Sequence, residues 1–592
     1  MSSKIPQKWS EETDFISIGS GIGGLSGAVV AEAWGLRAIV LEKAPTVGGV
    51  TAYSGGQLWA PANHHQRELG VEDSLDEALR YVLATGAGYN DEKMARNYLV
   101  HARLVVKWFE ENANIGLAVI KDFPDYYYPN ADGSRSDGRY LESAPFDGAS
   151  LGEWQSRTHL SPQMTSGLTM SEAVEHGGNM AFASWDKTLF DERVKNDQRT
   201  YGPGLGANFV KAALDRHITI YTSTPAQELI ADGGRVVGVR ATKDGSDYYI
   251  KANKGVLIAA GAYDWNESAH SAFTMVPNVK AAGPHEVTGD ALKLAGRLGG
   301  RITQVPQSLN AGFHIEGEEY NEKPLWRLGA GIIGVPHAIA VNRAGKRFAE
   351  ESFYRSVGFA LKKIDGATMQ HENYPYWGIQ DSQARQRYYF GPYAPGEEIP
   401  DAVVIKADSI RELARKAGID PDGLEAEITR FNAFVANDND EDFHRGERPW
   451  SAKSFGDITI EGNSNLGSIE KAPFYAIRME PLNIGLSNVG LAADAHNRVL
   501  TWDDEPIEGL YVAGNSMAMV EFGAGYTSGQ ANTRGMLGGY LAARHAAGDP
   551  SGARFEDAVG DEANAPAVAQ AGSVSASDDS IHLPLILPSH IR

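Results

Sequence analysis

Residues 14–42, DFISIGSGIGGLSGAVVAEAWGLRAIVLE, constrain the fold more than any other stretch of the chain. The apolar run at 14–19 predicts a buried strand, and the small residues of 21–34 predict a helix packed closely on a sheet. A second apolar run at 37–42 predicts the next, parallel strand. A strand, a glycine-rich turn, a helix and a parallel strand in this order indicate an α/β fold of the Rossmann-like kind.

The glycines of this turn are spaced for a dinucleotide. Gly19 permits the tight turn after the strand, and Gly21 lets the backbone approach a pyrophosphate at the helix N-terminus. Gly24 lets the helix lie against the sheet, and Gly23 is expected beside the ligand. Glu42 stands where an acid hydrogen-bonds a ribose 2′-hydroxyl and repels the 2′-phosphate of NADP. Together these features predict a dinucleotide site rather than a chance glycine turn.

Three further segments favour FAD over NAD. A second glycine-rich loop at 47–56 follows the acid-bearing strand and can accompany a longer ligand. The strand at 255–266 ends in small residues, and 507–518 brings back a strand and a helix N-terminus that would stabilise reduced flavin. The loop 47–56 has no histidine, so the FAD is expected to bind non-covalently. The other expected cofactor-binding residues are Lys43, Gly48, Gly49, Thr51, Ser54, Gly55, Gly56, Ala260, Gly261, Asp290, Gly514 and Asn515.

Composition excludes several classes of partner and cofactor. The chain has 592 residues and a net charge of −22, from 54 basic and 76 acidic residues, which disfavours nucleic acid. It has no cysteine, so disulfides, Cys-ligated iron–sulfur clusters and c-type haem attachment are excluded. The first 14 residues are polar and no apolar run reaches transmembrane length, so a cytoplasmic protein without a transmembrane segment is expected.

Changes in amino-acid composition along the chain predict a domain that is interrupted by a second one. Residues 1–300 are expected to form the first part of the cofactor-binding domain, and 481–548 to return to it. Residues 301–480 carry more aromatic and charged residues, which indicates a smaller inserted α+β domain. The segment 122–151 is expected to be a long ordered loop, and the Ala-, Ser- and Asp-rich tail 549–592 is expected to be disordered.

These motifs resemble the flavoprotein superfamily of fumarate reductases and 3-ketosteroid dehydrogenases, and within it the 3-ketosteroid Δ1-dehydrogenase branch. The resemblance extends to about residue 548 and implies a flavin domain interrupted by a smaller catalytic, capping domain. The more specific matching segments are PDYYYPNADGSRSDGRYLESAPFDG (124–148) and PHAIAVNRAGKRFAEESFY (336–354). The segments TGDALKLA (288–295), DEDFHRG (440–446) and GLYVAGN (509–515) complete the set.

The resemblance implies a division of roles among tyrosines. Tyr526 would polarise the substrate ketone together with a backbone N–H, and Tyr354 would take the proton from C2 while a hydride leaves C1 for flavin N5. Tyr126 would assist the base, with Tyr127 and Tyr128 as alternatives. A phenol with its ordinary pKa near 10 is a poor base at neutral pH, so the site is expected to lower the pKa of the base.

The chain departs from that branch in two loops. The branch usually carries Tyr-Pro/Ala-Gly-x-Gly where this chain has Tyr526-Thr527-Ser528-Gly529-Gln530, so the backbone donor is expected at Gly529 or Gln530. The Ser-Gly-Gln of this loop is closer to Δ4-(5α)-type relatives, and 481–491 lacks the usual Gly-Thr-x-Gly-Gly. The expected partners are therefore a steroid or smaller cyclic ketone and an external electron acceptor, either a quinone, a dye-like molecule or a partner protein.

Two other functions remain open at this point. A fumarate-reductase-like activity would need an arginine as proton donor in the inserted domain, and Arg355 lies one residue from the place where it would fall. It would also need His and Arg groups that clamp two carboxylates, and Arg534 is the nearest cation. Glu521 and Phe522 stand where that branch has His and Arg, which argues against it. A flavin-binding subunit without activity is the second alternative. No metal is expected, because the pair His64-His65 has no evident third ligand nearby in the sequence.

Overall fold

The computed structural model describes residues 5–163, 167–178, 180, 182, 184–306, 309–486, 488–549 and 554–563. Its largest sheet has eight strands, six of which lie in the order β23-β24-β11-β1-β2-β8. The other two form an antiparallel extension in which β10 pairs with β11 and β9 pairs with β10. The pairs from β24 through β8 are parallel, so the predicted strand–helix–strand unit is confirmed. The strands are β1 (Glu11–Ile18), β2 (Ala38–Leu41), β8 (Thr219–Tyr221), β9 (Ala226–Asp232), β10 (Arg235–Lys243), β11 (Ser246–Ile258), β23 (Arg498–Leu500) and β24 (Pro506–Val512).

Two glycine-rich helices from opposite ends of the chain lie against each other on this sheet. Helix α1 (Ile22–Ala33) packs on α16 (Gln530–Ala546). A Cβ at Gly539 would lie 2.4 Å from the carbonyl oxygen of Gly23, so the two backbones touch only because both positions lack side chains. The return segment is thereby held directly behind the glycine-rich turn.

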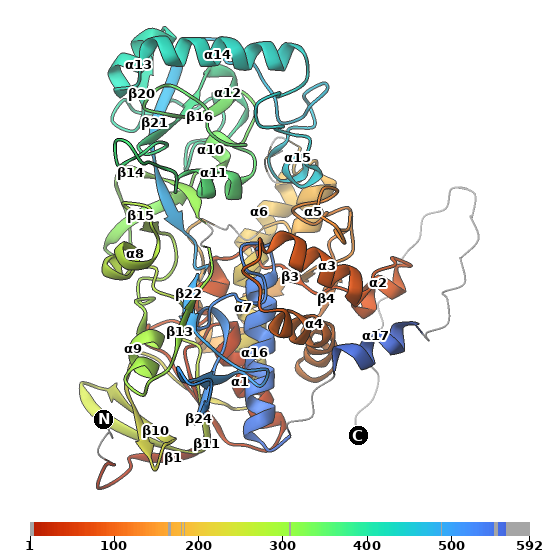
Figure 1. Ribbon diagram of the computed structural model, residues 1–592, viewed down its shortest axis with the longest axis vertical. Helices are drawn as coiled ribbons and strands as arrows, with labels where there is room; N and C mark the ends of the chain where they lie inside the picture. The colour runs from red at the N-terminus through yellow and green to blue at the C-terminus, as the bar shows by residue number, and fades with distance from the viewer. Residues whose placement is uncertain are drawn as a thin grey trace.

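A second sheet of seven strands forms the other half of the molecule (Figure 1). Its central order is β15-β14-β21-β19-β16, and β12 and β20 pair with β21. Helices α13 (Ile410–Ala417) and α14 (Pro421–Ala436) pack on each other at its far end. The strands are β12 (Lys280–Ala281), β14 (Asn310–Tyr320), β15 (Lys323–Leu328), β16 (Ala338–Asn342), β19 (Tyr376–Gln380), β20 (Ile405–Ala407) and β21 (Phe474–Asn483).

The remaining elements are short and connect or flank these two sheets. The strands are β3 (Leu58–Trp59), β4 (Leu117–Val119), β5 (Tyr140–Ser143), β6 (Phe146–Asp147), β7 (Gln198–Arg199), β13 (Ile302–Gln304), β17 (Ile364–Asp365), β18 (Gln370–His371) and β22 (Val489–Leu491). The 3₁₀ turns are η1 (Gly49–Tyr53), η2 (Gly148–Trp154) and η3 (Gly514–Ser516). The helices are α2 (His64–Glu68), α3 (Leu75–Thr85), α4 (Glu92–Ala113), α5 (Met170–Glu175), α6 (Lys187–Lys195), α7 (Tyr201–Asp215), α8 (Glu267–Phe273), α9 (Asp290–Gly296), α10 (Ala330–Ile333), α11 (Tyr354–Ala360), α12 (Ser382–Arg387), α15 (Pro449–Phe455) and α17 (Phe555–Ala563).

Two segments differ from their sequence-based expectations. The segment 122–151, expected to be a loop, contains β5, β6 and η2, because its Tyr- and Gly-rich sequence pairs with strands elsewhere in the chain. The tail 549–592, expected to be disordered, contains α17, where the buried Phe555 packs under the guanidinium of Arg96 on α4. Residues 550–553 and 564–592 lie outside the described part of the chain. The division at residues 300 and 480 stays a prediction.

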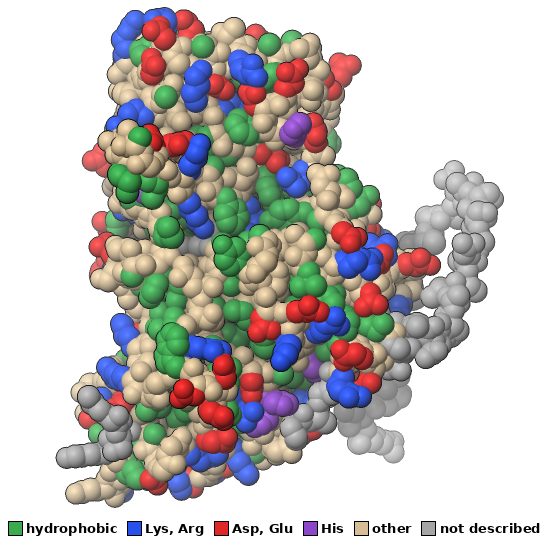
Figure 2. All heavy atoms as spheres, viewed as in Figure 1, with side chains coloured by type: hydrophobic (Ala, Val, Ile, Leu, Met, Phe, Trp, Pro, Cys, Tyr) green, Lys and Arg blue, Asp and Glu red, His purple; other side chains and the backbone are tan. Residues whose placement is uncertain are grey.

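The surface carries charges of both signs. Figure 2 shows acidic and basic side chains mixed over this face, with hydrophobic side chains gathered where the two halves of the molecule meet. Among the described residues, no helix combines the length and the apolar character needed to cross a bilayer.

One buried carboxylate joins the two halves and predicts a pH-dependent stability. Asp264 follows β11, and its Oδ1 accepts a hydrogen bond of 2.9 Å from Asn483 at the end of β21, while its Oδ2 has no partner among the described residues. Burial raises the pKa of Asp264 to about 7. The folded protein therefore holds this proton between pH 4 and 7 while the unfolded chain releases it. The contribution of Asp264 to the free energy of unfolding is therefore fully present below pH 4. It falls as the pH rises from 4 and is lost once the pH passes 7.

Replacing Asp264→Asn is expected to stabilise the protein above pH 7 by up to about 4 kcal/mol, because the amide stays neutral. The gain should vanish near pH 4. Urea unfolding at several pH values measures the difference between variant and wild type. Asp401→Asn, at an exposed carboxylate, is the matched control and should leave the pH dependence unchanged. A difference in the free energy of unfolding between Asp264→Asn and wild type that stays constant from pH 4 to 8 would contradict the raised pKa of Asp264.

Candidate active site

One large cavity, of about 540 Å³, collects most of the sequence-predicted residues. It extends from the turn between β1 and α1, past the end of β2, to the start of α16. On its other side it reaches β14, β15 and α10 of the second half. The predicted residues that line it are Gly19, Gly21, Gly23, Glu42, Lys43, Gly49, Thr51, Ser54, Gly55, Ala260, Gly261, Asp290, Gly514, Asn515, Tyr126, Tyr354, Tyr526 and Gly529.

Three predicted glycines shape the cavity without lining it. A Cβ at Gly24 would overlap the carbonyl oxygen of Gly19, so Gly24 serves the contact between turn and helix. Gly48 has a left-handed φ of 109°, and its N–H donates to Ser20. At Gly56, with φ 73°, a Cβ would lie 2.2 Å from the carbonyl carbon of Tyr201. The three glycines support the backbone around the cavity, and their contact with a ligand stays a prediction.

Glu42 is anchored at the end of β2. Its carboxylate accepts hydrogen bonds from Ser20 N at 2.9 Å, Ser20 Oγ at 2.5 Å and Ala44 N at 2.7 Å. Burial of the carboxyl raises its pKa in spite of these bonds. The glycine turn and the acid predicted from sequence are therefore joined directly. A contact of Glu42 with a ribose stays a prediction.

Lys43 and Asp290 were predicted separately and form one pair. Lys43 Nζ lies 2.9 Å from Asp290 Oδ2 and donates to Thr288 Oγ1 at 2.8 Å and to the Glu286 carbonyl at 3.0 Å. The pair ties the end of β2 to the start of α9. Both residues line the cavity, but their charges neutralise each other.

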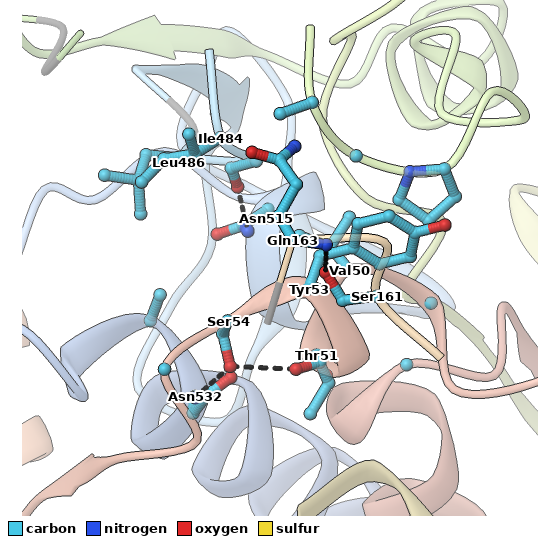
Figure 3. Close-up of a pocket in the computed structure, with 18 of the residues that line it drawn as sticks. Val50, Thr51, Tyr53, Ser54, Ser161, Gln163, Ile484, Leu486, Asn515 and Asn532 are labelled. Carbon is cyan, nitrogen blue, oxygen red and sulfur yellow. Dashed lines mark hydrogen bonds between the residues drawn. The ribbon is translucent and has the colours of Figure 1, made fainter. Parts of the chain in front are cut away.

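The second glycine-rich loop is bonded to α1 and to α16. Figure 3 shows the side chains of Thr51, Ser54 and Asn532 that take part. Thr51 Oγ1 accepts from Ile22 N at 3.0 Å, which covers the start of α1. Ser54 Oγ donates to the Thr51 carbonyl at 2.8 Å and accepts from Asn532 Nδ2 at 3.1 Å. Asn515 Nδ2 donates to the carbonyl of Gly485, and its buried Oδ1 has no partner among the described residues. Asn532, on α16, is a lining residue that the sequence did not reveal.

The structure brings the predicted tyrosines together. The hydroxyl oxygens of Tyr354 and Tyr126 are hydrogen-bonded at 3.4 Å, and their ring centroids lie 6.0 Å apart at nearly a right angle. Trp450 packs on Tyr126 with a centroid separation of 4.2 Å. Tyr526 lines the same cavity. Of the rival tyrosines, Tyr127 accepts a hydrogen bond of 2.7 Å from Arg355 and does not line the cavity.

A buried ion network fixes Tyr126. The preceding residue, Asp125, pairs with Arg139 at 2.7 Å and accepts 2.8 Å from the indole N–H of Trp59. Arg139 also pairs with Asp73 at 2.7 Å, and its side chain is 1% exposed. Removing Arg139 would leave the buried Asp125 without its cationic partner. This network gives a structural reason for the arginine of the Gly-Arg-Tyr motif in the segment 124–148.

A second buried network fixes the start of α11 and so Tyr354. Arg347 donates to Glu351 at 2.7 Å and pairs with Asp440 at 2.7 Å. Arg445 donates to the carbonyl of Ala338 at 2.7 Å and lies 3.3 Å from Glu351. The motifs 336–354 and 440–446 are therefore two halves of one ion network beneath the tyrosine.

The loop that carries Tyr526 selects one of the two proposed backbone donors. The N–H of Gln530 donates to the Thr527 carbonyl at 3.3 Å. The N–H of Gly529 has no hydrogen-bond partner among the described residues, and Gly529 lines the cavity with a left-handed φ of 83°. Thr527 holds the loop through its hydroxyl, 2.7 Å from that of Tyr140. This geometry favours Gly529 over Gln530.

The electrostatics of the tyrosines differ from expectation. Burial raises the pKa of Tyr354, and the nearby charge of Arg355 and the bond with Tyr126 only partly oppose this. The expected lowering of the base's pKa is therefore wrong for the protein alone, because loss of hydration outweighs the neighbouring charge. Burial also raises the pKa of Tyr526 strongly, so its hydroxyl stays protonated as a donor.

The two arginines considered for a fumarate-reductase-like activity are bonded to groups of the protein itself. Arg534 Nε lies 2.5 Å from Glu521, and its other nitrogens donate to backbone carbonyls, including that of Ala518 at 2.8 Å. Arg355 is buried and bonds Tyr127 and the carbonyl of Ala524. Neither residue lines the cavity. Arg355 Nη1 has no hydrogen-bond partner among the described residues, but it is buried outside the cavity lining.

The sequence missed the apolar wall of the cavity. These residues come from distant segments with no shared motif, and they include Met170, Phe182, Trp185, Phe313, Tyr389, Trp450 and Phe455. Arg327 also lines the cavity, but its guanidinium is bonded to Glu318 at 2.7 Å. Burial lowers the pKa of His159 to about 4, so it is neutral at pH 7. Among the described lining residues, no unpaired cation faces the cavity.

Comparisons with known proteins match this geometry. The model of the FAD binding domain family matches residues 14–531. The chain is 33% identical over 559 residues to 4-oxocyclohexanecarboxylate 2-dehydrogenase of Sinomonas cyclohexanicum, covering 92% of this chain and 95% of the relative. It is 30% identical over 575 residues to 3-oxosteroid 1-dehydrogenase of Mycolicibacterium smegmatis, covering 89% and 96%.

Among solved structures, a crystal structure of 3-ketosteroid Δ1-dehydrogenase from Sterolibacterium denitrificans with 1,4-androstadiene-3,17-dione matches with a TM-score of 0.82. It is 28% identical, and the match covers 91% of this chain and 100% of that one. The family match spans most of the chain, and the relatives cover nearly all of it. The chain therefore belongs to the FAD-binding-domain family of FAD-dependent oxidoreductases, as its sequence motifs predicted.

Proposed function

We propose that the protein dehydrogenates a cyclic ketone of 3-ketosteroid type, forming a double bond next to the ketone. Two relatives named 3-oxosteroid 1-dehydrogenase support this proposal, as does the similar fold of a 3-ketosteroid Δ1-dehydrogenase. The observation that carries it is the cavity itself, where hydrogen-bonded tyrosines face an apolar wall and every described lining lysine and arginine is paired. Such a wall suits a neutral, ring-shaped substrate better than a carboxylate.

The residues present fit FAD in the lower part of this cavity. The backbone at Gly21 is open, since a Cβ there would meet only Thr51 Oγ1 at 3.8 Å. The start of α1 supplies N–H groups, and Asn515 offers an unpartnered buried oxygen. Bound there, FAD supplies a two-electron acceptor for the hydrogen that leaves as hydride. We assign the strands around β1 to a Rossmann-like domain and the second sheet to a capping domain over it.

The chain's own groups would then divide the proton chemistry. Tyr526 and the N–H of Gly529 would donate hydrogen bonds to the ketone oxygen and stabilise the charge that develops on it. Tyr354 would take the proton from the adjacent carbon, with Tyr126 sharing a hydrogen bond with its oxygen. An external quinone, dye-like molecule or partner protein would take the electrons onward.

Spectroscopy without oxygen tests the proposal directly. Adding 4-androstene-3,17-dione to the FAD-loaded protein is expected to bleach the flavin absorbance and to yield a 1,4-diene, identified by mass and NMR. The same experiment with 4-oxocyclohexanecarboxylate tests the second candidate, which rests on the 33% identical relative. We expect slower bleaching by the carboxylate, because the cavity offers it no unpaired cation among the described residues. An oxidised spectrum with both ketones would overturn the proposal.

A further inference from the structure

A second cluster of ligand-type side chains lies between α2 and α4, and its residues do not line the cavity. His64 Nε2 lies 2.8 Å from Glu110 Oε2, and His65 Nε2 lies 2.7 Å from Glu110 Oε1. The three potential ligand atoms lie within 4.8 Å of one another. The sequence suggested no third ligand for the histidine pair, and the structure supplies one from α4.

Hydrogen bonding does not fully account for this cluster. The contact between His64 Nε2 and Glu110 Oε2 is short, yet Glu110 Oε2 is buried without a hydrogen-bond partner among the described residues. His64 Nδ1 is buried without one as well. The two imidazole rings are 4.0 Å apart and only 35° from parallel, so their nitrogens converge on the same carboxylate. Glu110 Oε1 is hydrogen-bonded, to His65 Nε2 at 2.7 Å and to the N–H of Leu117 at 3.3 Å, so the unpaired atoms are Glu110 Oε2 and His64 Nδ1. The convergence of two imidazole nitrogens on one carboxylate that is only half hydrogen-bonded suits a cation.

The surroundings complete a metal-binding arrangement. Glu68 Oε2 lies 3.4 Å from His65 Nδ1, the nitrogen that faces away from Glu110. A carboxylate on the outer nitrogen is the usual support of a metal-bound imidazole, because it fixes the ring and raises its basicity. The side chains of His64, His65 and Glu110 are 27%, 19% and 16% exposed, which leaves solvent access for a fourth ligand.

We propose that His64, His65 and Glu110 bind one divalent transition-metal ion, with Zn²⁺ preferred. Two imidazoles, one carboxylate and a water are a tetrahedral ligand set for zinc, with bonds of about 2.0–2.2 Å. The nitrogen–oxygen contacts of 2.8 and 2.7 Å would open by about 0.6 Å to admit the ion. The hard ion Mg²⁺ would be disfavoured, because it prefers oxygen ligands in octahedral geometry. The ion links α2, which follows the glycine-rich cofactor loop, to the long helix α4. Its role is structural: it holds α2, and with it the C-terminal end of the glycine-rich loop 47–56, against α4.

The test uses the full-length FAD-loaded protein, stripped with a chelator and then titrated with ZnCl₂ or MgCl₂. Calorimetry and elemental analysis should give one Zn²⁺ per chain and a Tm that rises with zinc but not with magnesium. His65→Ala and Glu110→Gln should each lower zinc affinity by more than about tenfold. His444→Ala is the matched control, since His444 is 68% exposed and pairs only with Glu447, at 3.0 Å, in the described part of the chain.

X-ray absorption on the zinc-loaded wild type keeps the test decisive if a variant misfolds. Two imidazoles in the first coordination shell are expected. Zinc binding that is unchanged in both variants, or a shell without imidazole, would overturn the site. Failure here leaves the proposed dehydrogenase activity untouched, because that activity is measured by flavin bleaching.

Discussion

Tyr354→Phe is expected to lower kcat/KM by about 10²- to 10⁴-fold, the usual contribution of a positioned general base. The hydroxyl removed is the one that lies 3.4 Å from Tyr126 and faces the cavity from the start of α11. The ring stays in place against Trp450, so packing changes little. Stopped-flow bleaching of the flavin by the ketone measures the chemical step without interference from the electron acceptor.

The pH profile separates a base from a merely structural tyrosine. A base acts only when deprotonated, and burial raises the pKa of Tyr354. The wild-type kcat/KM should therefore rise with pH, by about tenfold per unit, and should still be rising at the ordinary phenol pKa of about 10. Tyr354→Phe should abolish this slope. Arg355→Met should move it to higher pH, because the guanidinium favours the phenolate.

Tyr389→Phe provides the control for the same change elsewhere in the cavity. Tyr389 lines the cavity, but its ring packs on Phe182, 5.0 Å between centroids, away from the tyrosine pair. Its rate and pH slope should match the wild type. The flavin spectrum of every variant shows whether the cofactor is still bound. A Tyr354→Phe enzyme with wild-type bleaching would exclude this residue as the base.

Tyr526→Phe is expected to lower kcat by about 10²- to 10³-fold, the cost of removing one preorganised donor from a developing oxyanion. The effect should fall on kcat more than on KM, because the donated bond strengthens only as charge builds on the ketone oxygen. Burial keeps the Tyr526 hydroxyl protonated, so the rate lost should not depend on pH. Single-turnover rates at saturating ketone measure this loss.

The double variant distinguishes two groups in one step from two independent losses. If Tyr526 and Tyr354 act in the same proton transfer, their combined replacement should cost less than the product of the single effects. Thr527→Val is the nearby control, since it breaks the bond to Tyr140 and moves the loop without deleting the donor. A rate loss for Thr527→Val as large as that for Tyr526→Phe would point to loop position rather than donation.

Local patterns in the sequence predicted the parallel strands and the glycine turn around β1. Gly19 and Gly21 are required by a tight turn and an open backbone, and both properties belong to single residues. The apolar runs of β1 and β2 likewise encode a buried parallel pair. The tyrosines were found through motifs, and the ion networks of Arg139 and Arg347 give the physical reason for those motifs.

The sequence by itself determined the glycine turn and the strand–helix–strand unit, because spacing and residue type fix local backbone geometry. The candidate tyrosines came from the resemblance of its motifs to a known family. Only the tertiary structure decided which groups meet. It placed Tyr126 against Tyr354 across 228 residues and joined Glu110 to the histidine pair. It also paired Arg327 and raised the pKa of Tyr354. Contacts and desolvation of this kind depend on the packing of distant segments, which no local pattern contains.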